Sequence, residues 1–227
     1  MSNYVIGYIL VGVAMVIMLV AQSQVQNAYR KYRKVPNHLK ITGAQVAREI
    51  LDGNGLHDVQ IGQARGQLAD HYHPLNKTVN LSADIYNGTS IAALAIAAHE
   101  CGHAIQHQQN YAPLKMRGAI LPLANVGNYL GWAAIMIGFL SGATSIAWIG
   151  VGLMMGILAF QVITLPVEFD ASARALAILQ SRYLSSDEMD GAKSMLNAAA
   201  LTYIAAAFAT AMSILRIVLI LSGNRRD

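Results

Sequence analysis

The sequence has little charge and almost no cysteine. Charged residues make up 12% of the 227 positions and apolar residues 55%, whereas an average soluble domain is about one quarter charged. This composition argues against an ordinary soluble domain, and it excludes disorder, which requires low hydrophobicity and high net charge. The single cysteine, Cys101, excludes an intrachain disulfide framework and a zinc site built from several cysteines. Phe and Trp are also scarce, at four and two against ten Met, and this composition favours helices packed in lipid.

Four apolar stretches are long enough to cross about 30 Å of hydrocarbon as helices. The first, residues 4–21, is uncharged and has neither a basic segment before it nor a small-residue cleavage motif after it, so we expect a retained anchor within residues 1–21 rather than a signal peptide. The second and third, residues 118–140 and 144–165, are joined by three small residues and predict a transmembrane hairpin over 118–165. The fourth, 198–221, predicts a C-terminal transmembrane helix followed by a short tail to residue 227.

The basic residues predict how the chain is oriented. Of the 16 Lys and Arg, 13 lie in residues 22–117 and 166–197, and short loops rich in Lys and Arg stay on the cytoplasmic side. We therefore expect a multi-pass protein of the cell membrane whose soluble segments face the cytoplasm. The net charge of +4 does not predict a nucleic-acid partner, because the basic residues follow the membrane topology.

Residues 22–117 are far more polar than the rest and predict a small α+β domain. Thr42 can cap a helix over 44–51 that ends at the glycine-rich stretch 53–55. A turn at 73–77 precedes a strand of period two at 78–82. Residues 91–108 predict a helix that is apolar almost all round and is therefore buried.

That buried helix carries the pattern His-Glu-x-x-His. His99 and His103 are four residues apart, so both imidazoles lie on one helix face and can bind a single Zn²⁺. Glu100 points about 100° away from His99 and can act as a base toward an activated water. The alternative is a pair of core histidines. It would bury Glu100 with no basic residue between residues 83 and 115 to neutralise it, which is costly.

A catalytic zinc ion needs a third protein ligand. His107 lies too far along the helix, because His99 and His107 would be about 12 Å apart along its axis. Glu168 follows the transmembrane hairpin directly, so the hairpin returns it to the membrane face that carries the His-Glu-x-x-His helix. The alternative is that Glu168 stabilises the N-terminus of a helix that begins at Pro166.

The sequence resembles the bacterial putative neutral zinc metallopeptidases of the YugP type over nearly its whole length. The resemblance implies zinc, one ion per chain, on His99, His103 and Glu168, with Glu100 as general base. It also implies a protein or peptide substrate that is cleaved at the lipid bilayer. Other membrane proteins are further candidate partners. The matching segments are 42–47, 52–56, 70–72, 79–82, 98–106, 167–172 and 198–203.

A broader similarity to membrane-embedded metallopeptidases concerns the residues around the ligands. In those proteins an Asp follows the ligand Glu by four residues, where this chain has Ser172, and Asp170 is a candidate replacement. His71 and Tyr72, together with His73, are candidates for stabilising an oxyanion, although a structural role is the alternative for each. His107 is expected to contact a ligand or lie on the surface, and Cys101 to pack in the core.

The same similarity implies that the strand ending at Ser82 forms a sheet edge, to which a substrate could add. An ordinary core strand is the alternative.

The resulting fold expectation is an α-helical membrane protein of about four transmembrane helices with a small α+β zincin-like metallopeptidase domain over 22–117 and helices carrying the third ligand over 166–197. Two other functions are alternatives. A membrane scaffold with a structural metal site would not need Glu100, and a metal transporter would need more polar residues along its spans than this chain has.

Overall fold

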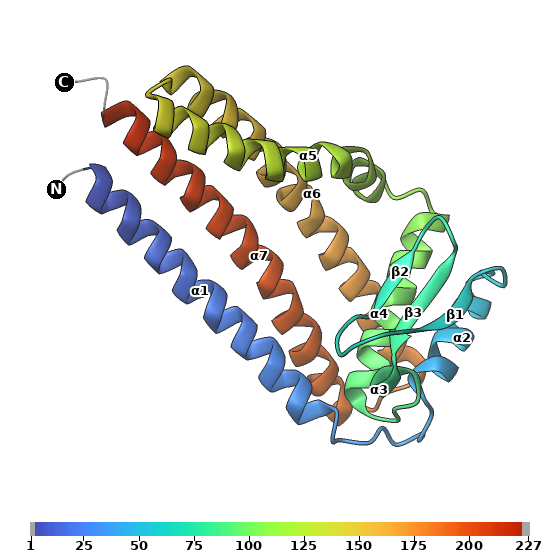
Figure 1. Cartoon of the computed structure of the whole chain (residues 1–227). Coiled ribbons are helices and arrows are strands. Elements are labelled where there is room, and N and C mark those ends of the chain that lie inside the picture. Colours follow the sequence, from blue (N-terminus) through green and yellow to red (C-terminus); the bar gives the residue numbers. More distant parts are fainter. Residues whose placement is uncertain (1–2, 224–227) are drawn as a thin grey trace. The chain divides into compact units, whose positions relative to one another are not determined.

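The computed structural model describes residues 3–223, most of which form helices (Figure 1). The described chain forms two compact units. The first holds residues up to Gln22, Lys115–Leu165 and the residues from Leu201 on, and the second holds Ser23–Leu114 and Pro166–Ala200. The elements in chain order are α1 (Asn3–Tyr32), α2 (Gly43–Gly53), β1 (Gln60–Ala64), β2 (His71–His73), β3 (Thr78–Ser82), α3 (Ala83–Tyr86), α4 (Ile91–Gln108), α5 (Ala112–Ser141), α6 (Thr144–Arg182) and α7 (Ser186–Gly223).

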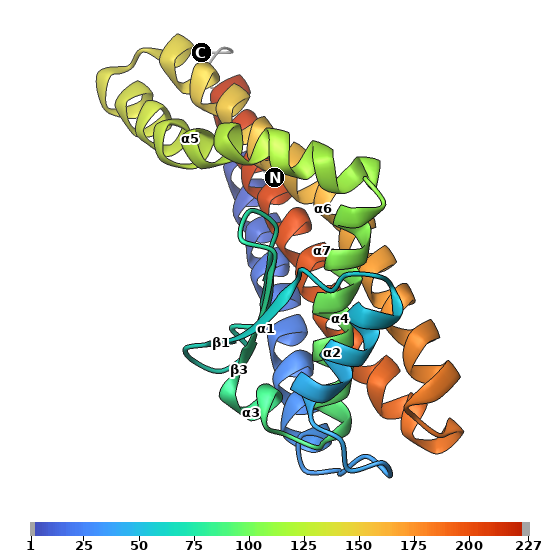
Figure 2. The same cartoon turned by 90° about the vertical axis from the view of Figure 1, so that its right-hand side faces the viewer.

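The first unit is built from apolar helices. Among the described residues, α1, α5, α6 and α7 are long and apolar enough to cross a membrane, in agreement with the expectation of about four transmembrane helices. Figure 2 shows α5 and α6 as a hairpin, whose short link uses Gly142 at a positive φ of 70°. Small residues let the two helices approach closely, because a Cβ on Gly138 would lie 2.6 Å from the backbone nitrogen of Ala147.

The helix α6 corrects one expectation. Pro166 does not begin a helix but lies inside α6, which continues from Thr144 to Arg182. Proline is tolerated inside apolar helices where the surrounding structure compensates for the lost hydrogen bond. The alternative role for Glu168, stabilising a helix N-terminus, is therefore wrong, since Glu168 lies deep inside α6.

The second unit packs a three-stranded sheet and α2 around α4. Thr42 and Gln45 form a reciprocal capping box at the start of α2, and Ser90 caps α4 by accepting from the backbone nitrogen of Ala93. Fifteen of the 18 residues of α4 are buried, as expected for a helix without a polar face. The surrounding core includes residues from α1, α2, β3, α6 and α7.

The strand order is β1-β3-β2, with β3 parallel to β1 and antiparallel to β2. Of the two alternatives for the strand ending at Ser82, the sheet edge is therefore wrong and the core strand is correct, because β3 is the central strand. The neighbouring strand β2 is an edge strand and lies against α4. Strand order depends on pairings far apart in the sequence, so the period-two pattern of 78–82 could not predict it.

Candidate metal centre

Two histidines of α4 and one glutamate of α6 lie together in the second unit. One potential ligand atom from each of His99, His103 and Glu168 lies within 4.8 Å of the other two. Oε2 of Glu168 is 3.3 Å from Nε2 of His99 and 3.7 Å from Nε2 of His103. The two imidazoles meet edge to face, with centroids 4.8 Å apart. Their side chains are 14% and 11% exposed and that of Glu168 is 3% exposed, so the cluster is nearly closed to solvent.

A glycine lets the two ligand-bearing helices approach this closely. A Cβ on Gly102 would lie 2.7 Å from the carbonyl oxygen of Ala171 and 3.2 Å from its Cα. The backbones of α4 and α6 are thus in direct contact between the turns that carry the histidines and Glu168. Any larger side chain at Gly102 would push α6, and Glu168 with it, away from the histidines.

In each histidine, the ring nitrogen Nδ1, which points away from Glu168, has a hydrogen-bonding partner. Nδ1 of His99 lies 3.1 Å from the Ser172 hydroxyl, and Nδ1 of His103 lies 3.0 Å from Oε1 of Gln106. Both Nε2 atoms therefore face the carboxylate of Glu168. Two imidazole nitrogens and one carboxylate oxygen, each imidazole held from behind, form a donor set that fits zinc.

Burial and charge act in opposite directions on His103. Burial lowers its pKa, but the hydrogen bond to Glu168 and the negative charge of Glu100 raise it more, and the net pKa is raised. A proton thus competes with a metal ion for Nε2 of His103 over a wider pH range than it would at an isolated histidine.

Comparison with known proteins agrees with this geometry. Residues 7–222 match the family model described as "Putative neutral zinc metallopeptidase". The chain belongs to this family. It is also 42% identical over 208 residues to the "Putative membrane protease YugP" of Bacillus subtilis (strain 168), an alignment that covers 91% of this chain and 92% of the relative. No solved structure matches the chain.

In this member of the zinc metallopeptidase family, Glu100 is buried beside the cluster but is not part of it. Its negative charge also acts on Asp70, whose pKa is raised mainly by burial and further by Glu100. Asp70 accepts hydrogen bonds from the backbone nitrogen of Ser82, at 2.7 Å, and from its hydroxyl. Asp70 therefore joins the start of β2 to the end of β3.

The structure separates the other candidate residues into three places. Tyr72 and His107 meet each other, with the Tyr72 hydroxyl 2.9 Å from Nδ1 of His107, and His107 lies outside the metal cluster. His71 is exposed and contacts the carbonyl oxygen of Ala69. Asp170 does not reach a histidine directly, because its carboxylate accepts from Gln106 and from Arg174. An oxyanion role for His71 or Tyr72 remains a prediction.

Sequence reasoning missed Gln106 and Asp70. Gln106 had a recognisable signal, since it follows His103 by three residues and is one of the few polar side chains on a helix expected to be buried all round. Asp70 lies in the segment 70–72 that carries the family resemblance, but its contact with Ser82 at the end of β3 has no signal in the sequence.

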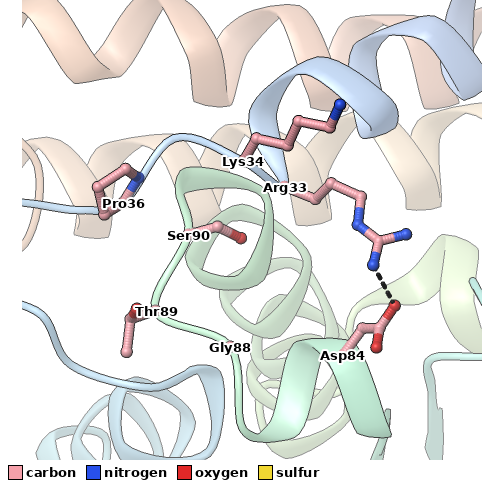
Figure 3. A pocket seen from close by; sticks show the side chains of 7 residues that line it. All are labelled: Arg33, Lys34, Pro36, Asp84, Gly88, Thr89 and Ser90. Atoms are coloured by element: carbon pink, nitrogen blue, oxygen red, sulfur yellow. Dashed lines mark ion pairs between the residues drawn. The ribbon is translucent and has the colours of Figure 1, made fainter.

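A separate hollow of about 350 Å³ lies near the start of α4 (Figure 3). Arg33 and Asp84, which face each other across it, form an ion pair at 3.0 Å. The Ser90 hydroxyl caps α4. These polar groups serve the protein's own structure. The lining residues are Arg33, Lys34, Pro36, Asp84, Gly88, Thr89 and Ser90.

Proposed function

We propose that this protein is an integral membrane zinc endopeptidase that hydrolyses peptide bonds in membrane or membrane-proximal proteins. The observation that carries the proposal is the convergence of His99, His103 and Glu168 within 4.8 Å, in a chain with four apolar helices of membrane-spanning length. Membership of a zinc metallopeptidase family supports the same conclusion. We further propose that one zinc ion binds per chain and that the site faces the cytoplasm, as the distribution of basic residues indicates.

The residues divide the chemistry between them. His99, His103 and Glu168 would hold the ion. Zinc, when bound, acts as a Lewis acid that makes a water molecule acidic enough to lose its proton near neutral pH. The carboxylate of Glu100 would take that proton and pass it to the leaving amine. Burial of Glu100 limits its contact with bulk water, which favours transfer of the proton within the site.

Zinc content and hydrolysis, measured together on the detergent-purified full chain, test the proposal. We expect about one zinc per wild-type chain by atomic spectroscopy, together with casein hydrolysis. Glu168→Ala should lose or greatly weaken both. Glu49→Ala removes an exposed carboxylate on α2 and should change neither, which makes it a matched control. Zinc retained by Glu168→Ala would show that Glu168 is not a ligand. Wild-type protein without zinc would contradict the proposal and favour a scaffold.

The general base is tested separately. Glu100→Gln keeps the size of the side chain but cannot accept a proton, so hydrolysis should fall by about a hundredfold to ten-thousandfold. Zinc content should remain at the wild-type level, because Glu100 is not among the three clustered residues. Full activity in Glu100→Gln would refute this mechanism.

A further inference from the structure

Gln106 is a completely buried polar side chain, 0% exposed, one turn beyond His103 on α4. Each polar atom of its amide has a partner. Oε1 lies 3.0 Å from Nδ1 of His103, and Nε2 donates to the carbonyl oxygen of Val167 and to Oδ2 of Asp170, both at 2.8 Å. A buried amide whose polar atoms all have hydrogen-bond partners is held in one orientation, so Gln106 does more than fill space in the core.

These partners determine which way the amide points. The backbone oxygen of Val167 can only accept, so it faces the NH₂ group of Gln106, and the amide oxygen must face His103. Nδ1 of His103 then has to donate, and its proton leaves Nε2 free to bind a metal ion. This is the nitrogen that lies 3.7 Å from Glu168.

The hydrogen bonds also join the two ligand-bearing helices. Val167, whose carbonyl accepts from Gln106, directly precedes Glu168 on α6. Asp170 is held in turn by Arg174, whose Nε donates to the same Oδ2 at 2.6 Å. Nη1 of Arg174 donates to Gln109, which follows α4, at 2.7 Å. The chain of contacts therefore leaves α4 at Gln106 and returns to its C-terminal end at Gln109.

His99 is held differently. Its partner, the Ser172 hydroxyl, can donate or accept, so this hydroxyl does not determine which nitrogen of His99 carries the proton. Of the two histidines, His103 alone has a partner of fixed direction. Among the described residues, the hydrogen-bond partners of the two Nδ1 atoms are a hydroxyl and an amide oxygen rather than a carboxylate, and Asp170 acts on His103 through the Gln106 amide.

We infer that Gln106 is the positioning residue of the metal centre, whose amide fixes the proton of His103 on Nδ1 and links His103 to the turn of α6 that carries Glu168. This inference rests on the proposed zinc site. It assigns to Gln106 and Asp170 together the orienting role that a single carboxylate would otherwise fill.

The test is metal affinity, measured on the detergent-purified full chain by competition with a zinc chelator. Gln106→Met keeps the length of the side chain but removes all three hydrogen bonds, and we expect zinc affinity to fall by about tenfold to a hundredfold. The visible absorption of the Co²⁺-substituted protein should also change, because His103 is no longer held in one orientation. Gln108→Met is the matched control, since Gln108 is exposed on the same helix and donates to the Asn54 carbonyl, away from the site; it should behave as wild type.

A purely structural role would lower the melting temperature of Gln106→Met and leave its zinc affinity and Co²⁺ spectrum unchanged, and that result would overturn the inference. If Gln106→Met does not fold, Asp170→Asn decides. The neutral amide introduced by this substitution accepts weaker hydrogen bonds from Gln106 and Arg174 than the carboxylate does, so Gln106 is held less firmly. Zinc affinity should fall, on the order of threefold, and an unchanged affinity would overturn the inference. Wild-type protein that binds no zinc would overturn the proposed function and this inference together.

Discussion

Cys101 lies inside the His-Glu-x-x-His motif, but its side chain faces away from the metal cluster. The thiol is fully buried and donates to the carbonyl oxygen of Ala47 on α2, at 3.6 Å. Burial raises the pKa of this thiol above its ordinary value, so almost no thiolate forms at neutral pH, and the thiolate is the reactive form. At the scale of single residues, Cys101 therefore belongs to the core.

We predict that Cys101 in the folded protein resists alkylation by iodoacetamide at neutral pH, under conditions that label the chain fully once it is denatured in SDS. Mass spectrometry of the intact protein measures the modified fraction. Cys101→Ala should keep zinc and hydrolysis, with a loss of stability of about 1 kcal/mol for the small cavity. Rapid alkylation of the folded protein, or loss of hydrolysis in Cys101→Ala, would show that the thiol is reactive or needed for activity and does not only pack in the core.

The residues that bring the candidate site together differ in how well the sequence predicts them. His99, Glu100 and His103 follow from one local spacing, and Glu168 follows from the return of the chain through a hairpin. Gln106 could have been noticed as a polar side chain on an apolar helix. Its partners, Val167 and Asp170, depend on how two helices pack, and packing between distant segments leaves no periodic signal in either one.

At the scale of secondary structure elements, the contact between α4 and α6 controls the geometry of the site. The space between the helices holds no side chain at Gly102, where a Cβ would lie 2.7 Å from the Ala171 carbonyl oxygen. Backbone atoms cannot rotate away as a flexible side chain can, so added volume must separate the helices. The geometry of the site thus depends on the absence of a Cβ at Gly102.

We predict that Gly102→Ala destabilises the fold by about 1–3 kcal/mol through overpacking and weakens zinc binding by moving Glu168. Thermal unfolding and chelator competition measure the two effects. Gly53→Ala is the control, because nothing lies within 4 Å of a Cβ at this position in α2, and alanine favours helix over glycine. Zinc affinity at the wild-type level in Gly102→Ala would mean that the close approach of the helices is not required.

Elements with a local signal were predicted well. The capped helix α2, the buried helix α4 and the strand β3 all lie where periodicity and capping residues place them. Two predictions failed because the deciding interaction was not local. β3 is central because it pairs with both β1 and β2, and α6 continues past Pro166, because the preference of proline for helix starts does not hold inside a long apolar helix.

At the scale of the whole molecule, the orientation of the chain decides which side of the membrane holds the site. Thirteen of the 16 basic residues lie in the two segments expected on the cytoplasmic side, and this excess is what favours that orientation.

Two exposed positions can be labelled to determine the orientation of the chain. Leu75, 89% exposed, lies in the turn between β2 and β3, and Ser141 lies at the exposed link between α5 and α6. If the helices span the bilayer, these positions are on opposite sides.

We predict that single cysteines at these positions, in a Cys101→Ala chain, react differently with a membrane-impermeant maleimide. Ser141→Cys should be labelled on intact cells. Leu75→Cys should be labelled only after the membrane is permeabilised, because its turn belongs to the same unit as His99 and His103. The wild-type chain is the control, since its buried Cys101 should stay unlabelled in both conditions. The opposite pattern would place the site outside the cell, where its substrates would be exported or surface proteins. The predicted pattern limits them to proteins reached from the cytoplasm, which is where a peptidase with this charge distribution would act.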